Sequence, residues 1–379
     1  MEVLVAGTAF FYLYKKFLLK SKLILLNWFC IIIVSFGCYK LMQLFVSISF
    51  VLNLFVAPPD SNLLVPAVPA SGYSLRDEVI IVPNKLTTAN SDFIYNAQMY
   101  ELGCDTLSNV IFWRNIMRLD KDSALLNLPE NRKVLYKVCL RTWDSLSLER
   151  KTAFKDSLRK VNCLSDSARI LLTNGKSFFY DFDKASANFH KGINAFIDNG
   201  VDPWYAQSIL LIESPNKLQK SNAGAYGSFQ LMKDVARLYG LKVNKTIDER
   251  ADFERSAYAA SSLIKKICIP KTRQILDSLG IKNYKETDLW FRLLVMHSYH
   301  AGAGNVRKAL YTFMPAEGNM NLIYSLWKAE TKYFRSASQN YSQLVLAAML
   351  EVHERYSLSP SQANAEVILK QKGKAKKPD

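Results

Sequence analysis

Glu213 is the residue whose type and position most directly suggest chemistry. Asp202 and Pro203 are typical of a helix start, as cap and first residue, and apolar residues follow at helical spacing up to Glu213. A carboxyl group at the end of an apolar stripe loses hydration, which raises its pKa and keeps it protonated closer to neutral pH. Such a group can act as a general acid. Burial of a glutamate side chain costs several kcal/mol of desolvation free energy, which a structural role alone does not explain. We therefore predict a catalytic role for Glu213.

Three blocks of sequence, in a fixed order, carry a resemblance to a known family. The first block is Glu213-Ser214, then Ala223-Gly224-Ala225-Tyr226-Gly227, then Gln230-Leu231-Met232. The second is Ser298-Tyr299-His300-Ala301-Gly302-Ala303-Gly304, and the third is Glu330-Thr331 with Tyr333. Together they resemble the lytic transglycosylases with a lysozyme-like, soluble-lytic-transglycosylase type catalytic domain, in particular the membrane-bound branch.

The resemblance implies a reaction as well as a fold. Lytic transglycosylases cleave the β-1,4 bond between N-acetylmuramic acid (MurNAc) and N-acetylglucosamine (GlcNAc) in peptidoglycan without consuming water. One glutamate, here Glu213, would protonate the glycosidic oxygen and then activate the 6-hydroxyl of the same sugar, which leaves a 1,6-anhydro-muramoyl end. Most glycosidases use two carboxylates. A nucleophile already held within the substrate removes the need for the second.

The same resemblance implies substrate-binding roles for five further residues. Ser214 and Gln230 would contact the substrate, and Tyr299 would lie beside the acid, where its hydroxyl can bond the carboxyl. His300 stands where the family usually has a substrate-contacting asparagine, and Glu330 would help to build the far wall of the groove. Plainer roles stay open for three of them: Ser214 as a helix-end cap, Gln230 as a polar contact within the fold and Glu330 as a solvated carboxylate.

Departures from the family pattern leave two other functions open. The loop between Glu213 and Gly224 is shorter than is usual in the family, and His300 replaces asparagine. A hydrolytic muramidase on the same fold would need a positioned water, held for example by Asp248 or Asp252. A weakly active peptidoglycan-binding scaffold protein is the other alternative. We expect no cofactor and no metal site, because the few histidines do not pair with cysteine or aspartate clusters.

The composition favours an anionic partner. The 379 residues include 49 lysines and arginines against 33 aspartates and glutamates, a formal net charge of +16. Peptidoglycan with its acidic stem peptides and an anionic membrane surface fit this charge, and no nucleic-acid motif is present. Four cysteines lie beyond the apolar N-terminus without metal-ligand spacing, and sequence alone cannot pair them.

A lysine-flanked apolar run near the N-terminus predicts membrane attachment and export. The run from Leu23 to Ala57 is too long for a soluble core helix, and lysines precede it. It is interpreted as a signal anchor, a cleaved signal or a lipoprotein signal ending at Cys38. We therefore expect the catalytic domain in the periplasm, attached to the cell envelope.

The chain as a whole is expected to be mainly α-helical. Its expected parts are a membrane or signal segment at 1–57, a proline-rich linker at 58–93, a helical region at 94–184, a lysozyme-like domain at 185–357 and a basic disordered tail at 358–379. Within the linker, Val79–Val82 is expected to be merely extended. Within the helical region, apolar stripes predict helices over 107–117 and 134–143 and a short helix from Ser165 to Gly175.

Overall fold

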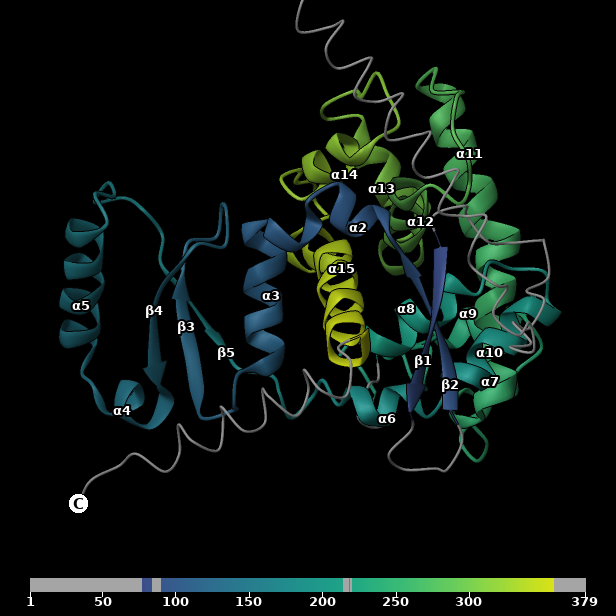
Figure 1. The fold of residues 1–379 in the computed structure, drawn as a ribbon, viewed down its shortest axis with the longest axis horizontal. Helices are drawn as coiled ribbons and strands as arrows, with labels where there is room; N and C mark the ends of the chain where they lie inside the picture. The colour runs from purple at the N-terminus through teal and green to yellow at the C-terminus, as the bar shows by residue number, and fades with distance from the viewer. Residues whose placement is uncertain (1–76, 84–89, 214–217, 219, 358–379) are drawn as a thin grey trace, which may run out of the picture. The chain divides into compact units, whose positions relative to one another are not determined.

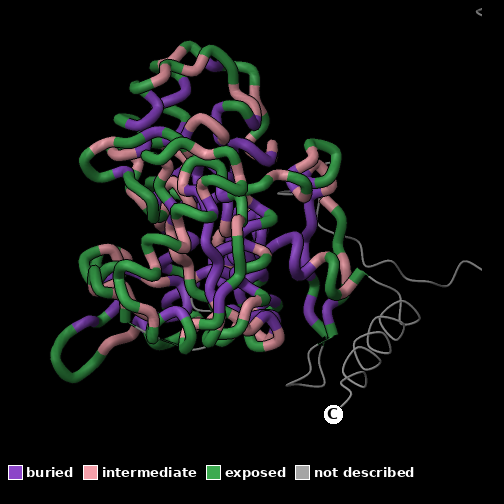
Figure 2. The backbone as a smooth tube through the Cα atoms, turned by 90° about the vertical axis from the view of Figure 1, so that its left-hand side faces the viewer, coloured by how far each residue is buried: buried purple, intermediate pink, exposed green. Residues whose placement is uncertain are grey.

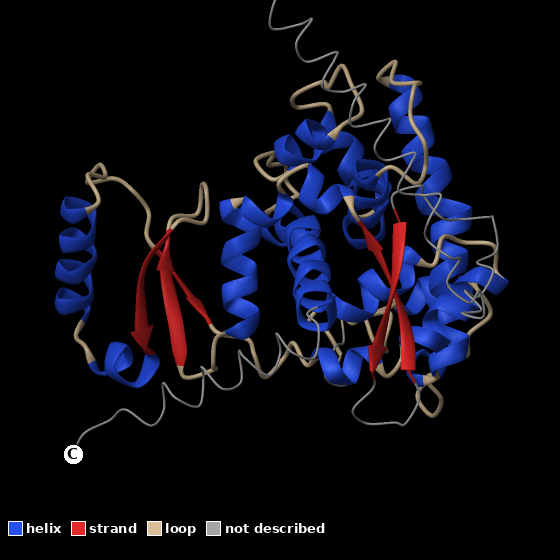
Figure 3. Cartoon of the chain, in the orientation of Figure 1, coloured by secondary structure: helices blue, strands red, loops and turns tan. Residues whose placement is uncertain are grey.

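The computed structural model describes residues 77–83, 90–213, 218 and 220–357, all of which lie in one compact unit, Pro69–Asp379 (Figure 1). The predicted membrane segment 1–57, the tail 358–379 and Ser214 lie outside the described residues. The described part is mainly helical, as predicted (Figure 3). None of its helices combines the length and apolar character needed to cross a membrane.

A two-stranded hairpin opens the described chain, within the predicted linker. Strand β1 (Asp77–Pro83) pairs antiparallel with β2 (Asn90–Asn96), with Asp77 opposite Asn96. The side-chain amide of Gln207 bonds both the N–H and the carbonyl of Ile94, so that a buried side chain substitutes for a further strand. The expectation of an unstructured linker is therefore wrong over 77–83 and 90–93, because a second apolar run pairs with Val79–Val82 as a strand and Val82 becomes buried.

A second, three-stranded sheet stands where only helices were predicted. Strands β3 (Ser123–Asn127), β4 (Val134–Cys139) and β5 (Leu171–Asn174) pair antiparallel in the order β4-β3-β5. Helices α4 (Leu140–Ser145) and α5 (Leu148–Val161) lie between β4 and β5 in the chain. The sheet and these helices have a small core of their own, which includes Leu126, Trp143, Leu158 and Ile170. We call residues 123–174 the sheet insert.

The helix predicted over 134–143 is thus wrong over 134–139, which form β4, and only 140–143 are helical, in α4. The helix predicted from Ser165 to Gly175 is wrong, and so is the expectation of an all-helical region 94–184. The apolar runs in this region are only four to six residues long in the structure, too short for periodicity to separate helix from strand. These runs form strands because β3 and β4 pair across the turn at Arg132, which has a φ of 58°. The helix predicted over 107–117 is confirmed as α3 (Ser108–Arg118).

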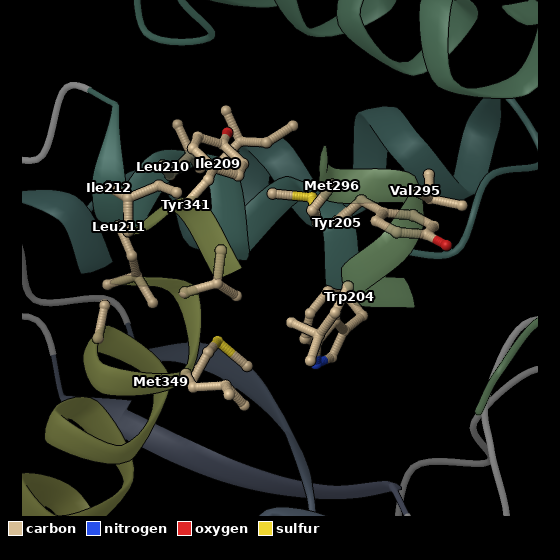
Figure 4. Packing of buried hydrophobic residues seen from close by; sticks show 14 of the residues in the cluster. Trp204, Tyr205, Ile209, Leu210, Leu211, Ile212, Val295, Met296, Tyr341 and Met349 are labelled. Carbon is tan, nitrogen blue, oxygen red and sulfur yellow. The ribbon is translucent and has the colours of Figure 1, made fainter. Parts of the chain in front are cut away.

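The main core surrounds helix α8 (Trp204–Ile212). Every residue of α8 is buried, because α7 (Phe189–Asp198), β2 and the long helix α15 (Ser336–Ser357) pack around it. Figure 2 shows buried residues gathered in the interior and exposed ones at the outer turns. Figure 4 shows side chains of α8 packed with Val295, Met296, Tyr341 and Met349. The helix begins just after Pro203, as predicted, but it is buried on all sides instead of along one stripe.

The remaining helices pack on α8 or on neighbouring helices. They are α2 (Gln98–Glu101), α6 (Phe182–Ser186), α9 (Lys233–Leu238), α10 (Phe253–Leu263), α11 (Ile269–Ser278), α12 (Leu289–Ala301), α13 (Ala303–Leu310) and α14 (Met320–Leu326). Short 3₁₀ turns occur at Cys104–Thr106 and Glu249–Ala251, and a π-helical turn, Ile264–Cys268, joins α10 to α11.

A buried ion-pair cluster fastens the hairpin to the helices. The Arg292 guanidinium of α12 donates to both carboxylate oxygens of Asp77 and to Asp202, each at 2.7 Å. The Arg292 and Asp77 side chains are 0% exposed and that of Asp202 is 13% exposed. Asp202 also accepts a 3.0 Å bond from the Trp204 amide at the start of α8. The hairpin is therefore part of the same folded unit as α8.

Candidate active site

Glu213 directly follows the last residue of α8 and opens into a pocket of about 290 Å³. The hydroxyl of Tyr341, on α15, donates a 2.7 Å hydrogen bond to Glu213 Oε1. The pocket wall includes residues from the glycine-spaced loop and from the end of α12, namely Ser221, Ala223, Ala225, Gln230, Leu231, Met232, Tyr299 and His300. The structure therefore brings Gln230, Tyr299 and His300 together around Glu213.

The surroundings of Glu213 favour its protonated form. Burial raises the pKa of the carboxyl from 4.5 to about 7, and the hydrogen bond from Tyr341 acts in the opposite direction without cancelling the effect. The C-terminal end of a helix is also the negative end of its dipole, which disfavours a carboxylate there. A carboxyl that holds its proton near neutral pH can donate that proton to a leaving oxygen.

Tyr341, and not Tyr299, supplies the hydrogen bond to the acid. The Tyr299 hydroxyl donates to the carbonyl of Phe229 at 2.6 Å and so braces the loop beside the pocket. Tyr333, the tyrosine of the third sequence block, is 61% exposed. Sequence reasoning missed Tyr341 because it lies 128 residues from Glu213, in a stripe that predicts only a helix. Its polar hydroxyl on the buried face of α15 was the one available signal.

The glycine-spaced loop presents Gln230 through a tight turn. Tyr226 and Leu231 exchange backbone hydrogen bonds of 3.1 and 3.0 Å, and Gly227 between them has a φ of 89°. A side chain at Gly227 would collide with the carbonyl of Arg250, so that only glycine fits. Gln230 itself has a φ of 46°, and its amide donates to the Gly227 carbonyl at 3.1 Å.

Arg250 holds this loop from behind. Its side chain is nearly buried, and one guanidinium nitrogen donates to the carbonyls of Gly224 and Leu231 at 2.8 and 2.9 Å. Asp248 pairs with the same guanidinium at 2.7 Å, which lowers the pKa of that carboxyl. Asp252 instead caps α10 by accepting from the Arg255 amide at 2.9 Å. Both aspartates considered for holding a water thus have structural partners.

His300 lies against the tyrosine that holds the acid. Its ring stacks on Tyr341 with 4.2 Å between ring centroids, while the residue as a whole is exposed to solvent. The protein packed around the imidazole lowers the pKa of His300 to about 4, and the exposure of the residue weakens this effect. His300 is consequently neutral near pH 7 and can both donate and accept hydrogen bonds at the pocket.

Glu330 does not line the Glu213 pocket. It is exposed and lies on a separate, larger pocket beside the sheet insert. In the part of the chain that the structure describes, no three histidine, cysteine, aspartate or glutamate side chains gather as a metal site would require. Cys104, Cys139, Cys163 and Cys268 are free thiols.

The match to a known family covers the elements just described. Residues 194–319 match the transglycosylase SLT domain. We refer to this matched range as the SLT domain. That domain is lysozyme-like and supports a lytic-transglycosylase type of activity on peptidoglycan. The matched range includes Glu213, the glycine-spaced loop, Tyr299 and His300, whereas Tyr341 lies beyond its end. No curated protein matches the chain.

Proposed function

We propose that the SLT domain cleaves the MurNAc–GlcNAc β-1,4 bond of peptidoglycan by non-hydrolytic transglycosylation and forms 1,6-anhydro-muramoyl ends. Glu213 acts first as acid and then as base. The observation that carries the proposal is its carboxyl, with a pKa near 7, held by one neutral donor at a pocket of the SLT domain. Such a group can give up its proton and take another at the same pH.

Tyr341 serves both stages of this cycle. Once Glu213 has protonated the glycosidic oxygen, the hydrogen bond from the Tyr341 hydroxyl becomes charge-assisted and stabilises the new carboxylate. The carboxylate is also held in one position, from which it removes the proton of the muramic acid 6-hydroxyl as that oxygen attacks C1. The proton returns to Glu213, and neither water nor a second carboxylate is consumed.

The lining of the pocket favours transglycosylation over hydrolysis. Glu213 is the one carboxylate among the described residues that line it. Inverting and retaining hydrolases both place a second carboxylate across the scissile bond, as base or as nucleophile. Asp248 is paired with Arg250, and Asp252 accepts from the Arg255 amide of α10.

Digestion of purified sacculi, followed by mass analysis of the products, tests this proposal. Release of anhydro-muropeptides is expected, with no release by Glu213→Gln. Products with reducing ends, 18 mass units heavier because water has been added, would establish a hydrolase instead. Binding to sacculi without any release by the wild-type chain would favour the scaffold alternative.

We also propose that the N-terminal segment places this domain in the cell envelope, on the periplasmic side of a membrane. The support is the lysine-flanked apolar run of residues 23–57. Fractionation of cells that express the full chain should recover it with membranes, and added protease should reach the SLT domain only after the outer barrier is opened. Recovery in the cytosolic fraction would contradict the proposal.

A further inference from the structure

A second pocket, of about 940 Å³, lies where the sheet insert meets the segment that leads into α15. The insert supplies the β3–β4 turn, with Arg132, and the stretch before β5, with Arg169. The other wall includes Trp327, Lys328 and Arg335. None of these residues lines the pocket of Glu213.

The charges that line this pocket fit an anionic ligand. Arg132, Arg169, Lys328 and Arg335 supply four cations against the two carboxylates Glu130 and Glu330. Arg132 is only 9% exposed, and its guanidinium is held by two neutral amide oxygens, those of Asn127 at 3.3 Å and Asn340 at 3.2 Å. Among the described residues no carboxylate lies within ion-pair distance of Arg132. Its charge is offset by the rings of Phe112 and Trp113, 5.3 and 5.5 Å away, and by the neighbouring carboxylate of Glu130, so the guanidinium has no direct anionic contact.

This wall is directly connected to the acid. Asn340, which accepts from Arg132, immediately precedes Tyr341, which donates to Glu213. Trp327, on the pocket lining, donates its indole N–H to Ser342 at 2.8 Å. Three consecutive residues of α15 therefore contact Arg132 of the charged pocket, Glu213 and Trp327. The charged pocket and Glu213 are thus linked through the first turns of α15.

We propose that this pocket binds a carboxylate-bearing peptide, namely a stem peptide of the peptidoglycan whose glycan is cleaved at Glu213. The inference rests on the proposed function, because it names the part of the same substrate that the sheet insert recognises. The volume falls in the range of ordinary ligand pockets and suits a short peptide. Glu130 and Glu330 would repel a polyphosphate but can pair with the amino group of a stem peptide.

The test compares two substrates of the full chain. One is sacculus glycan that carries its stem peptides, and the other is the same glycan stripped of them by an amidase. The double variant Arg169→Glu/Arg335→Glu reverses two exposed charges of the pocket and leaves buried Arg132 in place. We expect its KM for peptide-bearing glycan to rise about tenfold with kcat unchanged, and its activity on stripped glycan to equal the wild type.

A matched variant controls for net charge. Arg141→Glu/Arg150→Glu reverses two exposed arginines of the sheet insert that do not line the pocket, and it should behave as the wild type on both substrates. Equal losses by the pocket variant on both substrates, or no loss on either, would overturn the peptide site.

A binding measurement separates this proposal from the enzymatic one. If the wild-type chain cleaves neither substrate, the proposed function fails, and calorimetric titration with a free stem tetrapeptide still decides the pocket. Binding that Arg169→Glu/Arg335→Glu weakens about tenfold and Arg141→Glu/Arg150→Glu leaves intact would support the site. Absence of binding, or equal binding by all three proteins, would refute it.

Discussion

Helix α8 has a partly buried carboxyl group at each end, and the groups that surround the two carboxyls differ. At the start, Asp202 accepts from the Arg292 guanidinium at 2.7 Å and from the Trp204 amide at 3.0 Å. At the other end, Glu213 has the neutral hydroxyl of Tyr341 at 2.7 Å. Burial raises the pKa of both groups, but a cation and the positive end of the helix dipole counter it only at Asp202.

The difference shows how one rigid helix supports two tasks. The charged end is an anchor, because separating Asp202 and Asp77 from Arg292 would leave charge buried without a partner. The neutral end keeps an exchangeable proton at a pocket. Packing around α8 holds the two ends at a fixed separation, so the anchor also sets the position of the acid.

The largest expected effect lies at the neutral end. Glu213→Gln retains the shape of the side chain but has no proton to donate, and activity on sacculi should fall at least about 10³-fold. Thermal unfolding at pH 6 should show an intact fold. Glu254→Gln, an exposed glutamate of α10, is the matched control and should keep full activity. Substantial activity in Glu213→Gln would remove Glu213 from the mechanism.

The charged end should dominate stability. Asp77→Asn deprives buried Arg292 of one of its two carboxylates, and the free energy of unfolding should fall by about 3 kcal/mol. Denaturant titration measures this loss. Glu78→Gln changes the exposed neighbouring residue and should cost less than about 0.5 kcal/mol. Equal stabilities of the two variants would mean that the hairpin is not anchored through Arg292.

The pH dependence of stability should expose the raised pKa of Glu213. The folded chain binds a proton at Glu213 between pH 4.5 and about 7 that the unfolded chain releases, so ionisation above this window disfavours the folded state. Glu213→Gln removes this penalty and should gain about 2 kcal/mol relative to the wild type between pH 5 and pH 8, after allowance for the partial exposure of Glu213. A constant difference between the two proteins across this range would contradict the raised pKa.

The smallest expected effect comes from the donor at the neutral end. Tyr341→Phe removes the hydrogen bond that favours the ionised carboxylate, so the pKa of Glu213 should rise further. The alkaline limb of kcat/KM should move up by about 0.5–1 pH unit, and kcat should fall about tenfold because a hydrogen bond of roughly 1.5 kcal/mol is lost. Tyr333→Phe, at an exposed position, should change neither. If the alkaline limb of kcat/KM does not shift in Tyr341→Phe, Tyr341 has no part in setting the pKa of Glu213.

Long apolar stripes were predicted well, and short ones were not. The helices α3 and α8 follow from sustained helical periodicity and from local caps such as Asp202. The strands of the sheet insert and of the hairpin were missed because their apolar runs span seven residues at most. Such a run becomes a strand only when another strand pairs with it. One of the two strands that pair with β3 is β5, which lies more than forty residues further along the chain.

The sequence by itself singled out Glu213 as the candidate acid, since a helix start and an apolar face are local features around it. It also identified Gln230, Tyr299 and His300 as candidate site residues through short sequence blocks. Only the tertiary structure decided how each buried charge is paired: Tyr341 reaches Glu213 across 128 residues, and Arg292 reaches Asp77 across 215. Proton affinity depends on burial and on the groups in contact, and contacts between residues so distant in sequence exist only once the chain has folded.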